Sequence, residues 1–177
     1  MSKRALIVID VQNEYFPGGA WALPDAPTAM PNIAALVAGA RARGERIAFI
    51  RHVTPEGSPV FARGSAGAEL RPELGVGADD TVIEKSHPSA FQDTTLGDWL
   101  RDGGETELDI CGFMTQMCCD TTTREAYRNG FKARLFADAC AARDLEANGQ
   151  QVPHQMVHAA SLASLARFAQ VIHTRDA

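Results

Sequence analysis

The sequence predicts an α/β protein with three layers, α/β/α, whose six-stranded parallel sheet is doubly wound in the order 3-2-1-4-5-6. Short apolar runs such as 5–9 lack an alternation of polar and apolar residues, which is typical of strands covered on both faces of a parallel sheet. These runs alternate with segments of helical periodicity, and this alternation favours right-handed crossovers around one sheet.

Each element follows from the local pattern. Ile33, Leu36, Val37 and Ala40 are spaced i, i+3, i+4 and i+7, which predicts an amphipathic helix that Gly44 ends. Further helices are expected at 96–100, after Cys118, and at 157–168. The six strands are expected at 5–9, 47–50, 81–85, 108–111, 133–137 and 169–172.

Length and composition favour one globular domain spanning 1–177. The chain has 177 residues, of which 45% are hydrophobic and 22% charged, enough for a sizeable core. The net charge of −5 argues against a nucleic acid or an anionic membrane as partner, so a small-molecule substrate is expected. The first apolar run leads straight into Asp10, which is unlike a secretory signal, and no apolar stretch approaches the roughly 20 residues of a membrane span.

The cysteine pattern favours the cytoplasm. The four cysteines have neither C-x-x-C nor metal-site spacing, and a chain of this size does not need disulfides for stability. We therefore expect reduced thiols in a cytoplasmic protein.

The stretch 108–127, LDICGFMTQMCCDTTTREAY, is the most informative part of the chain. It predicts a buried strand that stops at Gly112 and then a helix with Cys118 in its first turn. Because N–H groups at a helix N-terminus stabilise negative charge, we expect a lowered pKa for Cys118 and a nucleophilic thiol. The alternative for any single cysteine is a small buried apolar residue, which suits Cys111, Cys119 and Cys140.

Two polar residues end other strands of the predicted sheet. Asp10 follows the first strand and Lys85 ends the third, so both are expected at the same sheet edge as Cys118. Asp10 is predicted to act as general base, and the Lys85 ammonium to favour the thiolate. Taken singly, Asp10 is explained by a turn and Lys85 by a solvated strand end.

Several motifs resemble the isochorismatase-like cysteine hydrolase superfamily, which includes nicotinamidases and carbamoylsarcosine-type amidohydrolases. They are DVQNEYF (10–16), EKSHPSAF (84–91) with Thr94-Thr95-Leu96, GFMTQMCCDTTTREAY (112–127) and FADAC (136–140). The resemblance implies a catalytic triad of Asp10, Lys85 and Cys118, with Cys118 rather than Cys119 as nucleophile because it lies six residues after the glycine.

The resemblance also implies a reaction and a local geometry. A non-proline cis peptide is expected between Phe113 and Met114, with the backbone N–H groups of Met114 and Cys118 as oxyanion hole. The implied activity is hydrolysis of a C–N bond in a small amide, carbamoyl or ureido compound through a thioester, with no cofactor. A homo-oligomer, dimer or tetramer, is implied too. A non-catalytic binding or scaffold protein of the same fold is the alternative.

One departure from the family concerns metal. Nicotinamidases of the superfamily bind a metal through an aspartate and closely spaced histidines after the second strand, whereas residues 50–61 here read IRHVTPEGSPVF. A lone His52 is a poor metal site, so we expect no metal and disfavour nicotinamide as substrate. Isochorismatases proper work without the cysteine, so Cys118 argues against that chemistry as well.

The substrate pocket is less sharply defined by the sequence. Residues 53–80 form a long connection with a possible short helix at 67–70, and connections of that length are often functional, so we expect it to cover the site. Gln116 is expected to contact substrate. Five aromatic residues in loops after strand ends line either an apolar pocket or a satellite core beneath the long loop: Tyr15, Phe16, Trp21, Phe61 and Phe91.

Overall fold

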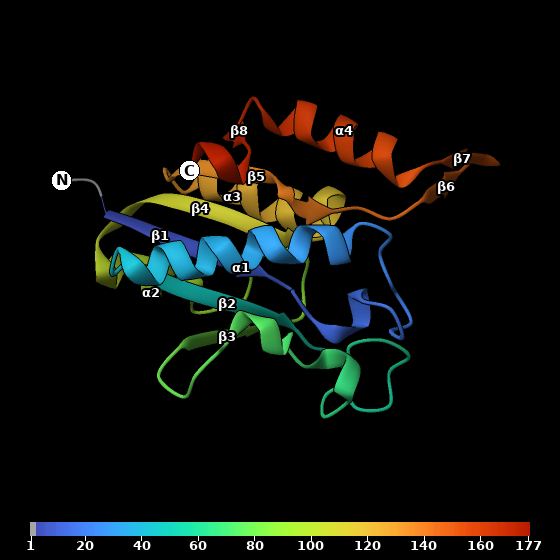
Figure 1. The fold of residues 1–177 in the computed structure, drawn as a ribbon, viewed down its shortest axis with the longest axis horizontal. Helices are drawn as coiled ribbons and strands as arrows, with labels where there is room; N and C mark the ends of the chain where they lie inside the picture. Colours follow the sequence, from blue (N-terminus) through green and yellow to red (C-terminus); the bar gives the residue numbers. More distant parts are fainter. Residues whose placement is uncertain (1–2) are drawn as a thin grey trace.

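A computed structural model describes residues 3–177, which form a six-stranded parallel sheet between two layers of helices (Figure 1). The strand order is β3-β2-β1-β4-β5-β8, which is the predicted order 3-2-1-4-5-6 when the sheet strands are numbered along the chain. Its strands are β1 (Lys3–Ile9), β2 (Arg46–His52), β3 (Thr81–Lys85), β4 (Glu105–Phe113), β5 (Lys132–Ala141) and β8 (Gln170–Ile172).

Burial on both faces explains why the strands show no alternation of polarity. In β1, Leu6 and Val8 pack on one side of the sheet, while Ala5, Ile7 and Ile9 pack on the other. All five side chains are almost completely shielded from solvent. An apolar residue is therefore favoured at every position of this strand.

The helices cover the two faces unequally (Figure 1). One face packs against α1, and the other against α2, α3 and the end of α4. The last helix ends at Leu165, so Phe168, expected within it, lies in the turn that follows. The helices are α1 (Ala26–Ala42), α2 (Leu96–Gly103), α3 (Asp120–Arg128) and α4 (His154–Leu165), none of which is long and apolar enough to cross a membrane.

A small hairpin was not expected. β6 (Leu145–Ala147) pairs antiparallel with β7 (Gln150–Val152), and the two strands extend away from the sheet (Figure 1). Asn148 and Gly149 connect them with φ values of +53° and +74°, as a two-residue hairpin turn requires.

The long connection between β2 and β3 is ordered by short turns. The short helix expected at 67–70 is a 3-10 turn at Ala66–Ala68, and a second one follows at Pro72–Leu74. Single bridges join Thr54 to Ala62 and Gln12 to Leu70, so the connection is anchored to the end of β1.

Candidate active site

Asp10, Lys85 and Cys118 meet at one edge of the sheet, although they are far apart in sequence. The Lys85 Nζ lies 2.7 Å from the Asp10 Oδ2 and 3.3 Å from the Cys118 Sγ. The residues are only 0%, 3% and 4% exposed, respectively. A carboxylate, an ammonium and a thiol therefore share a site from which bulk water is largely excluded.

The backbone at the ends of β1 and β4 sets this geometry. Asp10 has a φ of +51°, in the left-handed region, and its N–H donates to the Ile50 carbonyl across the neighbouring strand. Ile9 is paired with Gly112, whose φ is +118°. A Cβ at Gly112 would lie 2.0 Å from the Ile9 carbonyl oxygen, so only glycine permits this close approach.

The turn after β4 differs from the predicted one. The peptide bond between Phe113 and Met114 is cis, as expected, but Cys118 does not begin an α-helix. It lies within a π-helical turn, Thr115–Cys119, in which the Cys119 N–H donates to the Met114 carbonyl at 3.1 Å, and α3 starts only after it. An oxyanion hole formed by the N–H groups of Met114 and Cys118 stays a prediction.

The expected lowering of the Cys118 pKa is wrong. Burial of the sulfur and the nearby Asp10 carboxylate outweigh the opposing effect of Lys85 and raise the pKa of Cys118 to about 12. The sequence could not show this because burial depends on tertiary packing. The resting sulfur is therefore a thiol.

Lys85 stays charged despite its burial. Desolvation opposes the charge, the Asp10 carboxylate makes the largest opposing contribution, and the pKa of Lys85 is raised. Asp10 receives no hydrogen bond from any other N–H or O–H donor among residues 3–177. Apart from its ion pair with Lys85, the Asp10 carboxylate is therefore available to accept the proton of the neighbouring Cys118 thiol.

Lys85 has two further partners that sequence reasoning did not assign. Its Nζ lies 3.0 Å from the His87 carbonyl oxygen and 3.2 Å from the Nδ1 of His52. From the sequence, His52 enters only as a possible metal ligand. The signal that identifies it as a neighbour of Lys85 is positional, since both residues end adjacent strands and are directly paired in the β2–β3 register.

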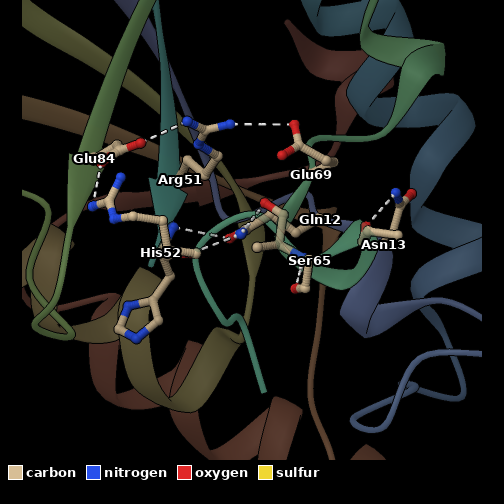
Figure 2. Close-up of polar contacts among 10 residues, drawn as sticks. Gln12, Asn13, Arg51, His52, Ser65, Glu69 and Glu84 are labelled. Atoms are coloured by element: carbon tan, nitrogen blue, oxygen red, sulfur yellow. Dashed lines mark hydrogen bonds and ion pairs between the residues drawn. The ribbon is translucent and has the colours of Figure 1, made fainter. Parts of the chain in front are cut away.

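The motif residue Gln12 ties the site to the long connection (Figure 2). Its side-chain amide accepts from the His52 N–H at 2.9 Å and donates to the His52 carbonyl at 2.8 Å. It also donates to the Ala68 carbonyl at 2.7 Å. Together with an Asn13 side-chain bond to the Ala66 carbonyl, these contacts hold the connection over the chain's own strand ends.

The predicted pocket residues divide into groups. Tyr15 packs against Phe61 and Phe113, with ring centroids 5.1 and 5.8 Å apart, and Trp21 packs edge-on against Phe61 at 5.8 Å. The ring of Phe61 also contacts His52, at 5.3 Å. These aromatic residues lie beside the polar cluster, so their assignment as pocket walls stays a prediction.

The other three pocket residues lie elsewhere. Phe16 packs against Phe113 and beneath the guanidinium of Arg71. Phe91 stacks on Phe131 at 6.0 Å, which favours the alternative that it belongs to the core. Gln116 lines an open surface hollow together with residues of α3, and its Oε1 is buried without a hydrogen-bond partner among the described residues.

The cluster differs from a metal centre in charge and donor set. Within residues 3–177, no three His, Cys, Asp or Glu side chains are grouped to hold a metal ion. The ring nitrogen of His52 that lies nearest the cluster faces an ammonium group, which repels a cation.

Comparisons with known proteins agree with this fold. A model of the isochorismatase domain matches residues 4–176. YddQ, an uncharacterised isochorismatase family protein of Bacillus subtilis, is 35% identical over 175 residues, covering 98% of this chain and 97% of that protein. The nicotinamidase of Escherichia coli is 28% identical, covering 79% of this chain and 84% of the enzyme.

Solved structures are similar over the same range. An isochorismatase from Pseudomonas putida superposes with a TM-score of 0.93 at 34% identity, covering 98% of this chain and 89% of that one. A cysteine hydrolase from Pseudomonas syringae superposes with a TM-score of 0.93 at 27% identity, covering 98% and 90%. The chain therefore belongs to the isochorismatase family, whose members include hydrolases.

Proposed function

We propose that the protein is a metal-independent cysteine hydrolase that cleaves a C–N bond of a small amide, carbamoyl or ureido compound through a thioester on Cys118. The observation that carries this proposal is the buried cluster in which the Lys85 ammonium lies 2.7 Å from Asp10 and 3.3 Å from the Cys118 sulfur.

Because the pKa of Cys118 is raised, the first half-reaction needs a general base, and we assign that role to Asp10. Because the resting sulfur is protonated, the thiol has to lose its proton as the sulfur attacks the substrate carbonyl carbon. Asp10 takes that proton, and the tetrahedral oxyanion is stabilised by backbone N–H groups of the turn at Met114 and Cys118. Asp10 then protonates the departing nitrogen, the C–N bond breaks, and a thioester remains.

The second half-reaction reverses these proton movements. A water molecule gives a proton to Asp10 while its oxygen attacks the thioester carbon. The C–S bond breaks, the acid product leaves, and the Cys118 sulfur recovers the proton. Throughout, Lys85 balances the negative charge as it passes between Asp10 and Cys118.

A metal-dependent nicotinamidase reaction is less well supported. Its family-type ligands would lie around His52, where the structure has the Lys85 ammonium at 3.2 Å. Dialysis against a chelator is expected to leave turnover unchanged, and a loss that zinc or iron restores would favour the metal-dependent alternative.

The test of the proposed function is turnover. The purified chain should release ammonia or an amine from members of a panel of small amides, carbamates and ureides. Cys118→Ala should lower kcat by about a thousandfold or more. Cys119→Ala, which removes the adjacent buried thiol, is the matched control and should retain kcat within about threefold.

Activity of Cys118→Ala near that of the unchanged protein would overturn the proposal. A folded, monodisperse protein that turns over no member of the panel would favour the binding or scaffold alternative. Slow alkylation of Cys118 at neutral pH does not separate the two, because a raised thiol pKa makes it slow in either case.

A further inference from the structure

The pairing of β2 with β3 places an imidazole against the buried ammonium. His52 and Lys85 are direct partners in the parallel register, as are Arg51 and Glu84 one position earlier. Since successive side chains point to opposite faces, Arg51 binds Glu84 at 2.6 Å on one side, and the His52 ring points to the other side (Figure 2). There its Nδ1 meets the Lys85 Nζ. The imidazole is thus placed by strand register.

The tautomer of His52 follows from its partner. An ammonium group has only donors, so the Nδ1 that lies 3.2 Å from the Lys85 Nζ has to accept and cannot carry a proton. The ring proton is then on Nε2. A neutral ring is favoured because burial and the Lys85 charge both lower the pKa of His52.

The ammonium has more acceptors than protons. Its three N–H groups face four acceptors within 3.3 Å: the Asp10 Oδ2, the His52 Nδ1, the His87 carbonyl oxygen and the Cys118 Sγ. The imidazole and the carbonyl keep their charge during the proposed reaction, whereas the carboxylate and the sulfur exchange a proton. Two N–H groups therefore have constant partners, and the third follows the negative charge.

We propose that His52 is a positioning residue that, through its neutral Nδ1, directs the Lys85 ammonium so that one N–H serves Asp10 and Cys118 alternately. This role rests on the proposed function. The side chain itself is held in place, because Gln12 bonds to both the N–H and the carbonyl of His52, and the Phe61 ring packs against the imidazole.

Protonation of His52 would cancel this role. A proton on Nδ1 would face the ammonium with a second positive charge, so the N–H directed at His52 would lose its acceptor. The charged and titratable groups facing the ring are Lys85 from β3, Asp10 from the end of β1 and His87 from the loop after β3. Only Asp10 favours the protonated ring, so acid is needed to produce it.

Kinetic pH profiles test this role on any substrate that the panel identifies. His52→Leu removes the acceptor and should lower kcat at pH 8 by about ten- to a hundredfold. In His52→Asn the Oδ1 replaces Nδ1 as acceptor without titrating near neutrality, so kcat at pH 8 should return to within about threefold of the unchanged protein. The acid limb of the kcat–pH profile of His52→Asn should lie about half a pH unit or more below that of the unchanged protein. An unchanged acid limb in His52→Asn, or no difference between the two variants at pH 8, would overturn the role.

His173→Asn is the matched control. Its half-exposed ring interacts with Asp138 at 3.8 Å and does not contact the cluster. Both the rate and the acid limb should stay as in the unchanged protein.

Nitrogen NMR of histidine-labelled protein tests the geometry without turnover. The chain has five histidines, and His52→Asn identifies the missing signals. We expect a neutral Nε2–H ring at pH 7 that titrates below 6.5, the ordinary value for histidine. An Nδ1–H tautomer or a charged ring at pH 7 would overturn the role of His52. If the tautomer is as expected but no compound is turned over, the proposed function fails while the His52–Lys85 contact stands.

Discussion

The Cys118 sulfur is a buried thiol, and in the reaction we propose its reactivity as a nucleophile depends on its neighbours. Burial and Asp10 raise its pKa, and Lys85 only partly offsets them. In the proposed reaction the sulfur becomes nucleophilic only when Asp10 accepts its proton, so the proposal needs the carboxylate as much as the thiol.

Alkylation of Cys118 should show this raised pKa directly. Since a thiolate fraction far below its pKa rises tenfold per pH unit, the rate with iodoacetamide should keep rising from pH 7 to 10 without a plateau. Peptide mass spectrometry after timed quenching measures it, with Cys118→Ala as blank. A plateau below pH 8 would mean that the thiol is ionised at rest.

Gly112 is the residue whose replacement should disturb the site most through the backbone. Gly112→Ala brings a Cβ to within 2.0 Å of the Ile9 carbonyl oxygen and should lower the free energy of unfolding by about 3 kcal/mol or more. Urea denaturation measures the change.

Gly130→Ala is the control that separates close approach from backbone conformation. Gly130 also has a positive φ, +85°, but no atom lies within 4 Å of the position that a Cβ would occupy there, so its replacement should cost only about 1 kcal/mol. Equal losses for the two variants would show that the contact with β1 is not the cause.

At the scale of elements, α4 is fastened to the turn that carries Cys118. The Thr115 hydroxyl lies 2.8 Å from the Nδ1 of His158, and the backbone of Ala137 is a further hydrogen-bond partner of that ring. Burial is the main cause of the lowered pKa of His158, so the ring accepts the hydroxyl proton in its neutral form.

Thr115→Val should loosen this attachment. It removes the donor and leaves a partly buried ring nitrogen without its partner, which should lower the free energy of unfolding in urea denaturation by about 1 kcal/mol. Thr121→Val on the exposed side of α3 is the control and should change little. If Thr115→Val is as stable as that control, the contact contributes nothing.

The lowered pKa of His158 makes the stability of the folded protein depend on pH, and the direction of the shift fixes the sign of that dependence. Because the folded protein resists protonation of His158, the unfolded chain takes up this proton first as the pH falls below 6.5. Stability should therefore be retained above pH 6.5 and decline toward pH 5. Replacement of His158 by Gln should remove part of that decline.

Strand ends were predictable where apolar runs met polar residues. Asp10 directly follows an apolar run and Lys85 ends the short strand 81–85, and the strand order then places them together with Cys118. The contact of His52 with Lys85 was not predictable, since it depends on the register between two strands. The thiol pKa and the π-helical turn depend on packing that local sequence does not encode, whereas the pair Asn148-Gly149 is a turn signal from which the hairpin could have been predicted.

At the scale of the whole molecule, association of several copies is the expected state. This expectation comes from the resemblance to the superfamily, and we propose that a second copy covers Met156, which is 64% exposed. Sedimentation velocity at micromolar concentration should give a dimer or tetramer. Met156→Lys should shift it toward a monomer, and a monomer for the unchanged chain would contradict this expectation.

The most direct test of the account is a search for the covalent intermediate. The protein is mixed with a turned-over amide or ureide, quenched in acid within the first turnover, and its peptides are weighed. The account predicts an acyl or carbamoyl adduct on Cys118, absent from Cys119 and from the Cys118→Ala variant. Full turnover by Cys118→Ala, or an adduct on a different residue, would contradict it.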